Sequence, residues 1–172
     1  MIAAVVLAAG AATRFGSPKQ RLLLPHVLDA LRASSVGDVV VVTGAHEVET
    51  EARVVHCEEW ERGPGASLRC GLVAVSHKVE AAVVVLADGP ALDPRAVDRV
   101  IEAWWHGAGD RLAATYDGTN RSHPVLLVRA TWGDIPDEGA RGLAVTLVPC
   151  DDLRDPGDVD TQAGWTHGDG ES

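Results

Sequence analysis

The chain has 172 residues, of which 46% are hydrophobic and 23% are charged, and its formal net charge is −10 at pH 7. This length predicts one domain with a substantial core, and the composition excludes a disordered chain. An acidic surface repels polyanions, so we expect no nucleic acid partner. No apolar run reaches the ~18–20 residues of a membrane span, so we expect no membrane association. The cysteines Cys57, Cys70 and Cys150 are too few and too scattered for a disulfide framework, and we expect each to lack a partner.

The predicted elements begin with an apolar run that has no positively charged segment before it, unlike a signal peptide. We therefore expect a buried first strand and a cytoplasmic protein. The apolar runs along the chain are continuous rather than alternating, which is typical of strands buried on both faces of a parallel sheet. These predicted strands cover residues 2–7, 39–43, 81–86, 112–115, 124–129 and 145–148.

Helices are predicted between the strands, at residues 25–34, 66–78 and 94–106. The third helix has the clearest start, because Asp93 can cap it and Pro94 occupies its first position. The alternation of strands and helices predicts an α/β fold with helices on both faces of the sheet. We expect one domain over residues 1–166, followed by a frayed tail at residues 167–172.

Ligands of such sheets bind beyond the carboxyl ends of the strands, and the segment after the first strand is rich in small residues. Gly10 and Gly16 let the backbone approach a ligand closely, and Arg14 and Lys19 supply two cations for an anion. Residues 1–28 hold these cations and Arg21 but no acid, which indicates a local anion site in an acidic chain. The segment is neither a P-loop nor a GxGxxG fingerprint, and a glycine-rich surface turn remains an alternative.

Two acidic positions are candidate metal ligands. Asp88 directly follows the predicted strand at residues 81–86, where a carboxylate can hold Mg²⁺. Asp158 and Asp160 lie two residues apart, on one face of an extended segment, and one of them can join Asp88 at a divalent ion. The alternatives are that Asp88 caps the following turn and that the second pair belongs to an acidic surface turn.

Six stretches, in the same order, resemble the MobA/MocA-like nucleotidyltransferases, a family that includes the molybdenum cofactor cytidylyl- and guanylyltransferases. The resemblance covers nearly the whole chain and is closest to the cytidylyltransferases. The matching stretches lie at residues 7–20 (LAAGAATRFGSPKQ), 60–72 (WERGPGASLRCGL), 86–90 (LADGP), 122–126 (SHPVL), 137–141 (DEGAR) and 158–161 (DVDT).

The resemblance implies a three-layer, Rossmann-like fold of the nucleotide-diphospho-sugar transferase type with a mostly parallel sheet. It also implies Mg²⁺-dependent transfer of a nucleoside monophosphate from a nucleoside triphosphate to a phosphorylated small molecule such as molybdopterin, with release of pyrophosphate. A molybdenum hydroxylase would receive the product. The implied catalytic residues are Arg14, Lys19 and Asp88, and the implied metal ligands are Asp88 and Asp160. The implied nucleotide-binding residues are Leu7, Ala8, Ala9, Gly10, Gly16, Ser67, Leu68 and Gly71, the last three in a turn at residues 67–71.

The resemblance also implies that His123 lies on the acceptor side. An equal alternative is that His123 only packs beside Pro124. Ala8-Ala9-Gly10 resembles the cytidylyl branch, so we expect CTP rather than GTP. The chain departs from the family after Gln20 and between Gly139 and Asp160, where it is short, and this leaves the acceptor open. The alternatives are transfer to another phosphorylated acceptor, of guanylyl, sugar or cofactor type, and a nucleotide-binding paralogue without catalysis.

Overall fold

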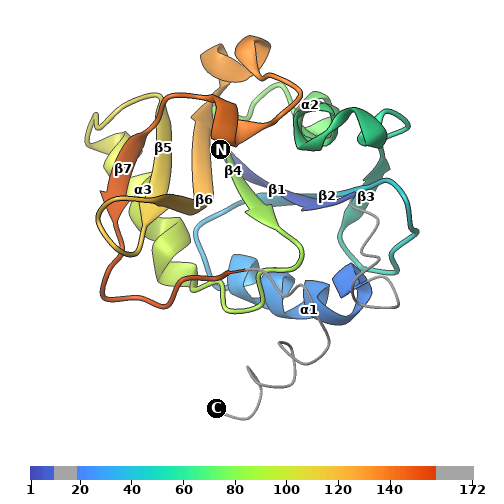
Figure 1. The fold of residues 1–172 in the computed structure, drawn as a ribbon, viewed down its shortest axis with the longest axis horizontal. Coiled ribbons are helices and arrows are strands. Elements are labelled where there is room, and N and C mark those ends of the chain that lie inside the picture. Colours follow the sequence, from blue (N-terminus) through green and yellow to red (C-terminus); the bar gives the residue numbers. More distant parts are fainter. Residues whose placement is uncertain (10–18, 158–172) are drawn as a thin grey trace.

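The computed structural model describes residues 1–9 and 19–157, with the backbone alone for residues 19–22. Within this part of the chain, seven strands form one sheet in the order β3-β2-β1-β4-β6-β5-β7 (Figure 1). The strands are β1 (Ile2–Ala8), β2 (Asp38–Thr43), β3 (Arg53–His56), β4 (Ala81–Leu86), β5 (Arg111–Thr115), β6 (Arg121–Val128) and β7 (Thr146–Pro149). The helices are α1 (Lys19–Arg32), η2 (Trp60–Arg62), α2 (Pro64–Ala74), α3 (Pro94–Trp105), η3 (Arg129–Asp134) and η4 (Ala140–Gly142).

The sheet is mostly parallel, as predicted. Strand β1 pairs in parallel with β2 and β4, and β7 pairs in parallel with β5. Strand β6 is antiparallel to both of its neighbours, β4 and β5. The start of β6 therefore lies at the same edge of the sheet as the carboxyl ends of the parallel strands. This is the edge at which ligands of such sheets bind.

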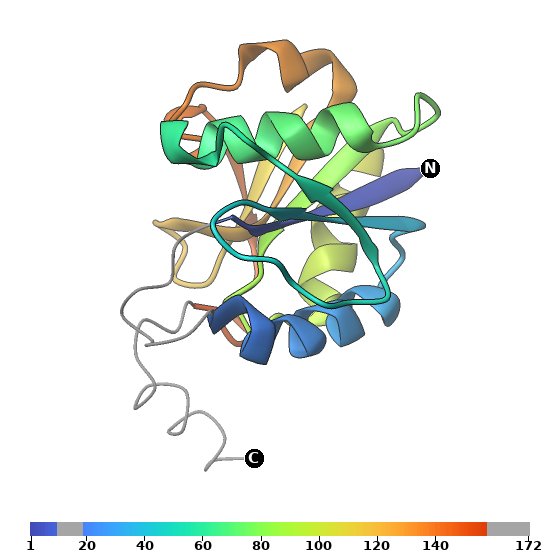
Figure 2. The same cartoon turned by 90° about the vertical axis from the view of Figure 1, so that its right-hand side faces the viewer.

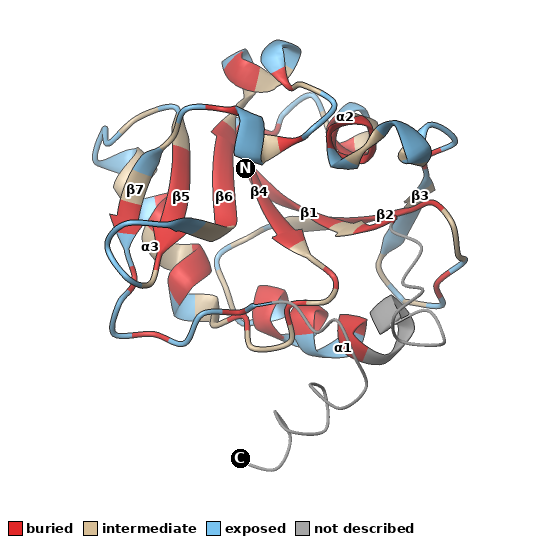
Figure 3. Cartoon of the chain, viewed as in Figure 1, coloured by how far each residue is buried: buried red, intermediate tan, exposed pale blue. Residues whose placement is uncertain are grey.

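The sheet separates two helical layers. Helix α2 and η3 cover one face, and α1 and α3 cover the other (Figures 1 and 2). Along β1, Ala3 and Val5 pack toward α2, while Ala4 and Val6 pack toward α1 and α3. The interior strands are consequently buried on both faces, which explains their continuous apolar sequence (Figure 3).

Helix α1 begins six residues before the predicted start at Pro25, which lies inside the helix. Proline removes a backbone donor and disfavours the helix interior. The preceding turn nevertheless carries Leu23 and Leu24, which are both buried, and Leu24 belongs to the same core as Val27 and Leu31. Burial of these side chains on one helical face outweighs the local penalty of Pro25.

The start of α3 confirms the predicted cap. The carboxylate of Asp93 accepts a hydrogen bond from the Arg95 N–H at 2.8 Å, and Pro94 begins the helix. Strand β3 has no counterpart among the predicted strands. It is short and exposed at the edge of the sheet, so its sequence lacks the apolar run that marks the interior strands.

The expectation that Cys57 and Cys70 lack partners is wrong. Their sulfur atoms form a disulfide, and their Cα atoms lie 5.9 Å apart. Cys57 follows β3 and Cys70 lies in α2, and these two segments meet only when the helix packs on the sheet. Cys150 is free and buried, as expected.

Several predictions concern positions outside the described residues. These are Gly10, Arg14, Gly16, Asp158, Asp160 and the tail at residues 167–172. Within the described part, no helix has the length and apolar character needed to cross a membrane.

Candidate active site

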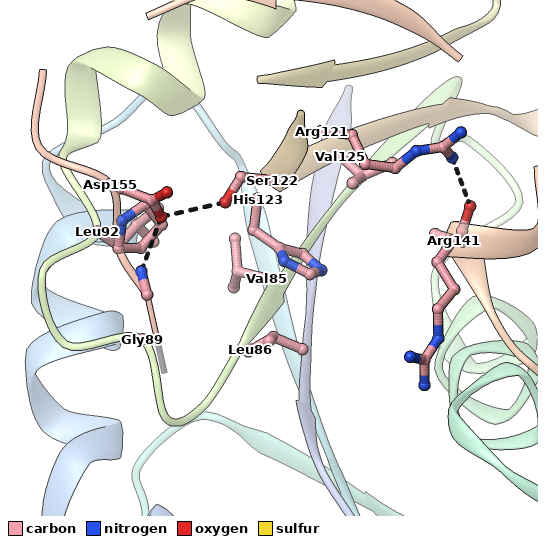
Figure 4. Close-up of a pocket in the computed structure, with 13 residues that line it drawn as sticks. Val85, Leu86, Gly89, Leu92, Arg121, Ser122, His123, Val125, Arg141 and Asp155 are labelled. Atoms are coloured by element: carbon pink, nitrogen blue, oxygen red, sulfur yellow. Dashed lines mark hydrogen bonds between the residues drawn. The ribbon is translucent and has the colours of Figure 1, made fainter. Parts of the chain in front are cut away.

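A pocket of about 410 Å³ lies at the ligand-binding edge of the sheet (Figure 4). Its floor comes from the end of β4, and its centre is His123, near the start of β6. The turn after β4, the η4 segment and the segment at residues 155–157 complete the walls. The lining residues are Val85, Leu86, Gly89, Leu92, Arg121, Ser122, His123, Val125, Ala140, Arg141, Asp155, Pro156 and Gly157.

In the sequence, Asp88 lies between the lining residues Leu86 and Gly89, in the turn that follows β4, and it is half-buried. The Gly89 N–H donates to the Leu86 carbonyl at 3.3 Å and closes the turn. A Cβ added at Gly89 would lie 3.1 Å from the Gly157 carbonyl oxygen, so the C-terminal segment passes directly against this turn. Gly157 is the last described residue, and the sequence continues into Asp158 and Asp160. The segment that leads to this acidic pair therefore lies against the turn that carries Asp88.

His123 is half-buried, and its imidazole projects between the two walls of the pocket (Figure 4). Its backbone is fixed because the Tyr116 hydroxyl donates to its carbonyl at 2.7 Å. Burial lowers the pKa of His123 to about 4, and the carboxylates of Asp88 and Asp155 oppose this shift. The imidazole is thus neutral near pH 7 and can exchange hydrogen bonds with a ligand without adding charge.

Asp155 joins β6 to the C-terminal segment. One of its oxygens, Oδ1, accepts from the Ser122 hydroxyl at 3.2 Å and from the Gly157 N–H at 2.9 Å. Sequence reasoning missed both Ser122 and Asp155. Ser122 stands within the quoted SHPVL stretch, beside His123, and that position was the available signal.

Arg121 and Arg141 line the wall opposite Asp155, and sequence reasoning assigned them no role. The Arg121 guanidinium donates to the carbonyls of Ala140 and Leu143 and so attaches β6 to η4. The Arg141 Nε donates to the Glu138 carbonyl at 3.4 Å. Arg141 belongs to the quoted DEGAR stretch. The resemblance of this stretch to the family was the available signal that Arg141 has a functional role.

The DEGAR stretch is held against α2 by Arg69, within the SLRCGL part of another quoted motif. Arg69 donates to the Ile135 carbonyl at 2.7 Å and to Asp137 Oδ1 at 2.5 Å. The hydrogen bond from Arg69 lowers the pKa of Asp137. Two motifs that are far apart in the sequence are therefore connected through one arginine.

The predicted nucleotide-binding residues of the second motif lie in α2, not in a turn. Ser67 and Leu68 are 2% and 0% exposed, and Leu68 packs in the core between the helix and the sheet. A Cβ added at Gly71 would lie 2.5 Å from a methyl group of Val5 and 2.8 Å from one of Val42, so this glycine permits close packing on the sheet. Their role toward a nucleotide stays a prediction.

The first predicted motif starts at the same edge of the sheet. Ala8 and Ala9 are buried, and the Leu7 carbonyl accepts from the Ala87 N–H at 3.0 Å, next to Asp88. The end of β1 thus adjoins the turn that carries Asp88. Of the predicted cations, Lys19 begins α1 and only its backbone is described.

Among the described residues, no three His, Cys, Asp or Glu side chains are close enough together to hold a metal ion. The donors near the pocket are single carboxylates, and such sets fit an ion that keeps several waters or substrate oxygens. Chemically, the described part of the site offers two cations, a neutral histidine and carboxylate oxygens around one pocket.

The fold and the site define a three-layer α/β protein of the nucleotide-diphospho-sugar transferase type. Among solved structures, Rv0371c from Mycobacterium tuberculosis H37Rv has a TM-score of 0.80 to this chain and 26% identity, over 100% of both chains. A complex of Rv0371c with manganese from the same organism has a TM-score of 0.75 and 25% identity, over 96% of each chain.

The model of the MobA-like NTP transferase domain matches residues 4–148, so the chain belongs to this family. The bifunctional protein GlmU of Sorangium cellulosum is 31% identical over 130 residues. That alignment covers 64% of this chain and 26% of GlmU, so the chain spans about a quarter of this curated relative.

Proposed function

We propose that this protein is a Mg²⁺-dependent nucleotidyltransferase. It transfers CMP from CTP to a phosphorylated acceptor such as molybdopterin and releases pyrophosphate. One observation carries the proposal: the Asp88 turn, the His123 pocket and the segment leading to Asp160 meet at one edge of the sheet. Membership in the MobA-like family supports nucleotidyl transfer as the reaction class.

In the proposed reaction, an oxygen of the acceptor phosphate attacks the α-phosphorus of the triphosphate. The bond from the α-phosphorus to the bridging oxygen breaks, and pyrophosphate leaves with the bonding electrons. Such transfers need positioning and charge neutralisation more than covalent help from the protein. Arg14 and Lys19 neutralise the triphosphate and the leaving pyrophosphate, and backbone N–H groups near Gly10 and Gly16 bind its oxygens. Leu7, Ala8, Ala9 and the Ser67–Gly71 part of α2 lie toward the base and ribose.

Asp88 and Asp160 would hold the metal ion. Asp88 fits this role because its half-buried carboxylate stands at the end of β4, beside the segment that leads to Asp160. Two carboxylates with substrate oxygens and waters suit Mg²⁺. When bound, the ion supplies charge neutralisation on the α-phosphate. A solved complex of the related Rv0371c contains manganese, which supports a divalent ion in this fold.

CTP is the proposed nucleotide because Ala8-Ala9-Gly10 resembles the cytidylyl branch. The cytoplasm is the proposed location, and a molybdenum hydroxylase is the proposed recipient of the product. Transfer to a different phosphorylated acceptor is the second candidate. The stretch between Gly139 and Asp160 favours this second candidate, because it is shorter than in the family and leaves the acceptor open.

The test is pyrophosphate release from CTP, GTP, ATP and UTP with Mg²⁺ and a panel of phosphorylated acceptors that includes molybdopterin. We expect release with CTP and molybdopterin, and a loss of about 100- to 1,000-fold in kcat for Asp88→Asn, because the variant would weaken the binding of the metal ion that neutralises charge in the transition state. The control is Asp110→Asn, because Asp110 precedes β5 at the opposite edge of the sheet.

The other outcomes of this assay favour different functions. Release with another acceptor but not with molybdopterin favours the second candidate, and a GTP preference favours the guanylyl branch. A chain that binds nucleotides but releases no pyrophosphate with any acceptor is a paralogue without catalysis. Equal activity of Asp88→Asn and Asp110→Asn contradicts the role of Asp88.

A further inference from the structure

The pocket around His123 has walls of opposite charge. Asp155 lies on one side of the imidazole, and Arg121 and Arg141 lie on the other (Figure 4). The floor between them is apolar and comes from Val85 and Leu86. A ligand that fills this pocket must therefore present different chemistry to its two ends.

The terminal nitrogens of Arg141 are available for a ligand. Most arginines of the described part are engaged, since Arg69 and Arg99 bind carboxylates and Arg129 binds two carbonyls. Arg141 is exposed, and within the described residues the only hydrogen bond of its side chain is that of Nε with the Glu138 carbonyl. Its two NH₂ groups thus keep the fork geometry that binds an oxyanion through two hydrogen bonds.

Arg121 fixes the segment that carries this group. Its guanidinium donates to the carbonyls of Ala140 and Leu143, on either side of Arg141. The backbone of Arg141 is therefore held toward the pocket, and the charge of Arg121 remains beside it. Positioning of this kind lowers the entropy lost when a flexible side chain binds a ligand.

The opposite wall offers an acceptor of hydrogen bonds. Oδ1 of Asp155 is occupied by Ser122 and Gly157, and these two bonds fix the carboxylate. Oδ2 accepts no hydrogen bond from a described residue. A bare phosphate placed there would meet like charge, whereas a hydroxyl or amine of a ligand can donate to it.

We propose that this pocket selects an acceptor with an oxyanion at one end, bound by Arg141, and a hydroxyl or amine at the other end, bound by Asp155. The proposal deepens the proposed function, because it assigns the pocket to the acceptor of that reaction. It makes Arg141 and Asp155 the residues that determine specificity, with Arg121 as a positioning residue.

The test is binding of small probes in the absence of nucleotide, followed through the ¹H–¹³C NMR signal of the His123 ring at pH 7.5. The signal is assigned by its loss in His123→Gln. Glycerol 3-phosphate carries an oxyanion and hydroxyls, methyl phosphate lacks the hydroxyls, and glycerol lacks the charge. We expect glycerol 3-phosphate to shift the signal saturably, methyl phosphate to bind more weakly, and glycerol to have no effect.

Variants separate the two walls. Arg141→Gln should weaken binding of both phosphates about 10- to 100-fold, as expected for loss of a charged hydrogen-bonding partner, and Arg141→Lys should restore part of it. Asp155→Asn should weaken glycerol 3-phosphate more than methyl phosphate. The matched control is Arg32→Gln, because Arg32 is exposed on α1 and is paired with Asp29. Circular dichroism checks that each variant is folded.

Unchanged affinity in Arg141→Gln, or an equal effect of Arg32→Gln, overturns the proposal. So does an equal response to glycerol and to glycerol 3-phosphate. The assay needs no turnover, so it separates this inference from the proposed function. Probe binding without pyrophosphate release contradicts only the proposed function. Pyrophosphate release together with unchanged probe affinity in Arg141→Gln contradicts only the inference.

Discussion

His123 illustrates how one side chain acquires its properties from its neighbours. Tyr116, which directly follows β5, fixes the carbonyl of His123 through its hydroxyl. The walls of the pocket shield the imidazole ring from water. Burial lowers the pKa of the imidazole to about 4, although Asp88 and Asp155 favour its protonated form. A neutral imidazole can hydrogen-bond a phosphorylated ligand in either direction, depending on its tautomer.

The low pKa of His123 predicts how stability depends on pH in the absence of metal ions. Because the folded-state pKa of about 4 lies below the unfolded value near 6.5, the unfolded chain binds the proton more tightly. The stabilising contribution is complete above pH 6.5 and is lost as the pH falls toward 4. We expect the free energy of unfolding of the wild type to fall by about 2 kcal/mol more than that of His123→Gln over this range.

The measurement is urea unfolding at several pH values in EDTA, with His77→Gln as the control because His77 is exposed. Parallel pH profiles for the wild type and His123→Gln contradict the prediction. A steeper fall in His123→Gln contradicts its sign.

Helix α2 shows how one element connects several parts of the site. Gly71 brings it close to β1 and β2, Arg69 holds the loop before η4, and Cys70 is bonded to Cys57 after β3. The Gly65 N–H at its first turn also donates to the Asp137 carbonyl at 2.9 Å. A shift of this helix would therefore move the segment that carries Arg141.

Gly71→Ala should destabilise the protein, because the added methyl would overlap the side chains of Val5 and Val42. Alanine is the better helix former by about 1 kcal/mol, but overpacking of a dense core costs about 1–3 kcal/mol and opposes this gain. We expect a net loss of about 1 kcal/mol, measured by chemical unfolding. The matched control is Gly133→Ala, because a Cβ at Gly133 meets no atom within 4 Å. A Gly71→Ala variant as stable as the wild type would show that α2 can shift at no cost.

At the scale of the whole molecule, the pocket brings two arginines together in a protein whose net charge is −10. Arg14, Lys19 and Arg21 follow β1, while Arg121 and Arg141 come from the second half of the chain and line the pocket. The carboxyl ends of β1 and β4 are adjacent because these strands pair in register. A local group of cations can bind a triphosphate even in a protein whose net charge is negative.

This arrangement predicts stabilisation by nucleotide. CTP with Mg²⁺ at ~100 times its Kd should add ~2.7 kcal/mol to the free energy of unfolding, which corresponds to about 5–10 °C in Tm for a chain of this size. GTP, ATP and UTP should shift Tm less. Lys19→Ala should abolish most of the CTP shift, whereas Lys78→Ala, which replaces the second of the two lysines, should not. An equal CTP shift in both variants contradicts the role of Lys19.

The sequence by itself determined the interior strands, the positions of the three α-helices and the family. Continuous apolar runs mark strands that are buried on both faces, and Asp93 with Pro94 marks the start of α3, because these signals depend on neighbours along the chain. Asp88 and His123, which the motifs singled out, lie at the edge of the sheet where the parallel strands end, and their roles there stay predictions. The exposed edge strand β3 and the start of α1 before Pro25 did not follow from local signals.

Only the tertiary structure decided which distant residues meet. The bond between Cys57 and Cys70, the contact of Arg69 with the loop before η4, and the opposed charges of Asp155 and Arg141 each join segments that no local pattern relates. Their positions depend on how the helices pack on the sheet and on the antiparallel insertion of β6 next to β4. A local pattern records what a residue needs from its chain neighbours, whereas a binding pocket is formed by groups that packing brings together from remote parts of the chain.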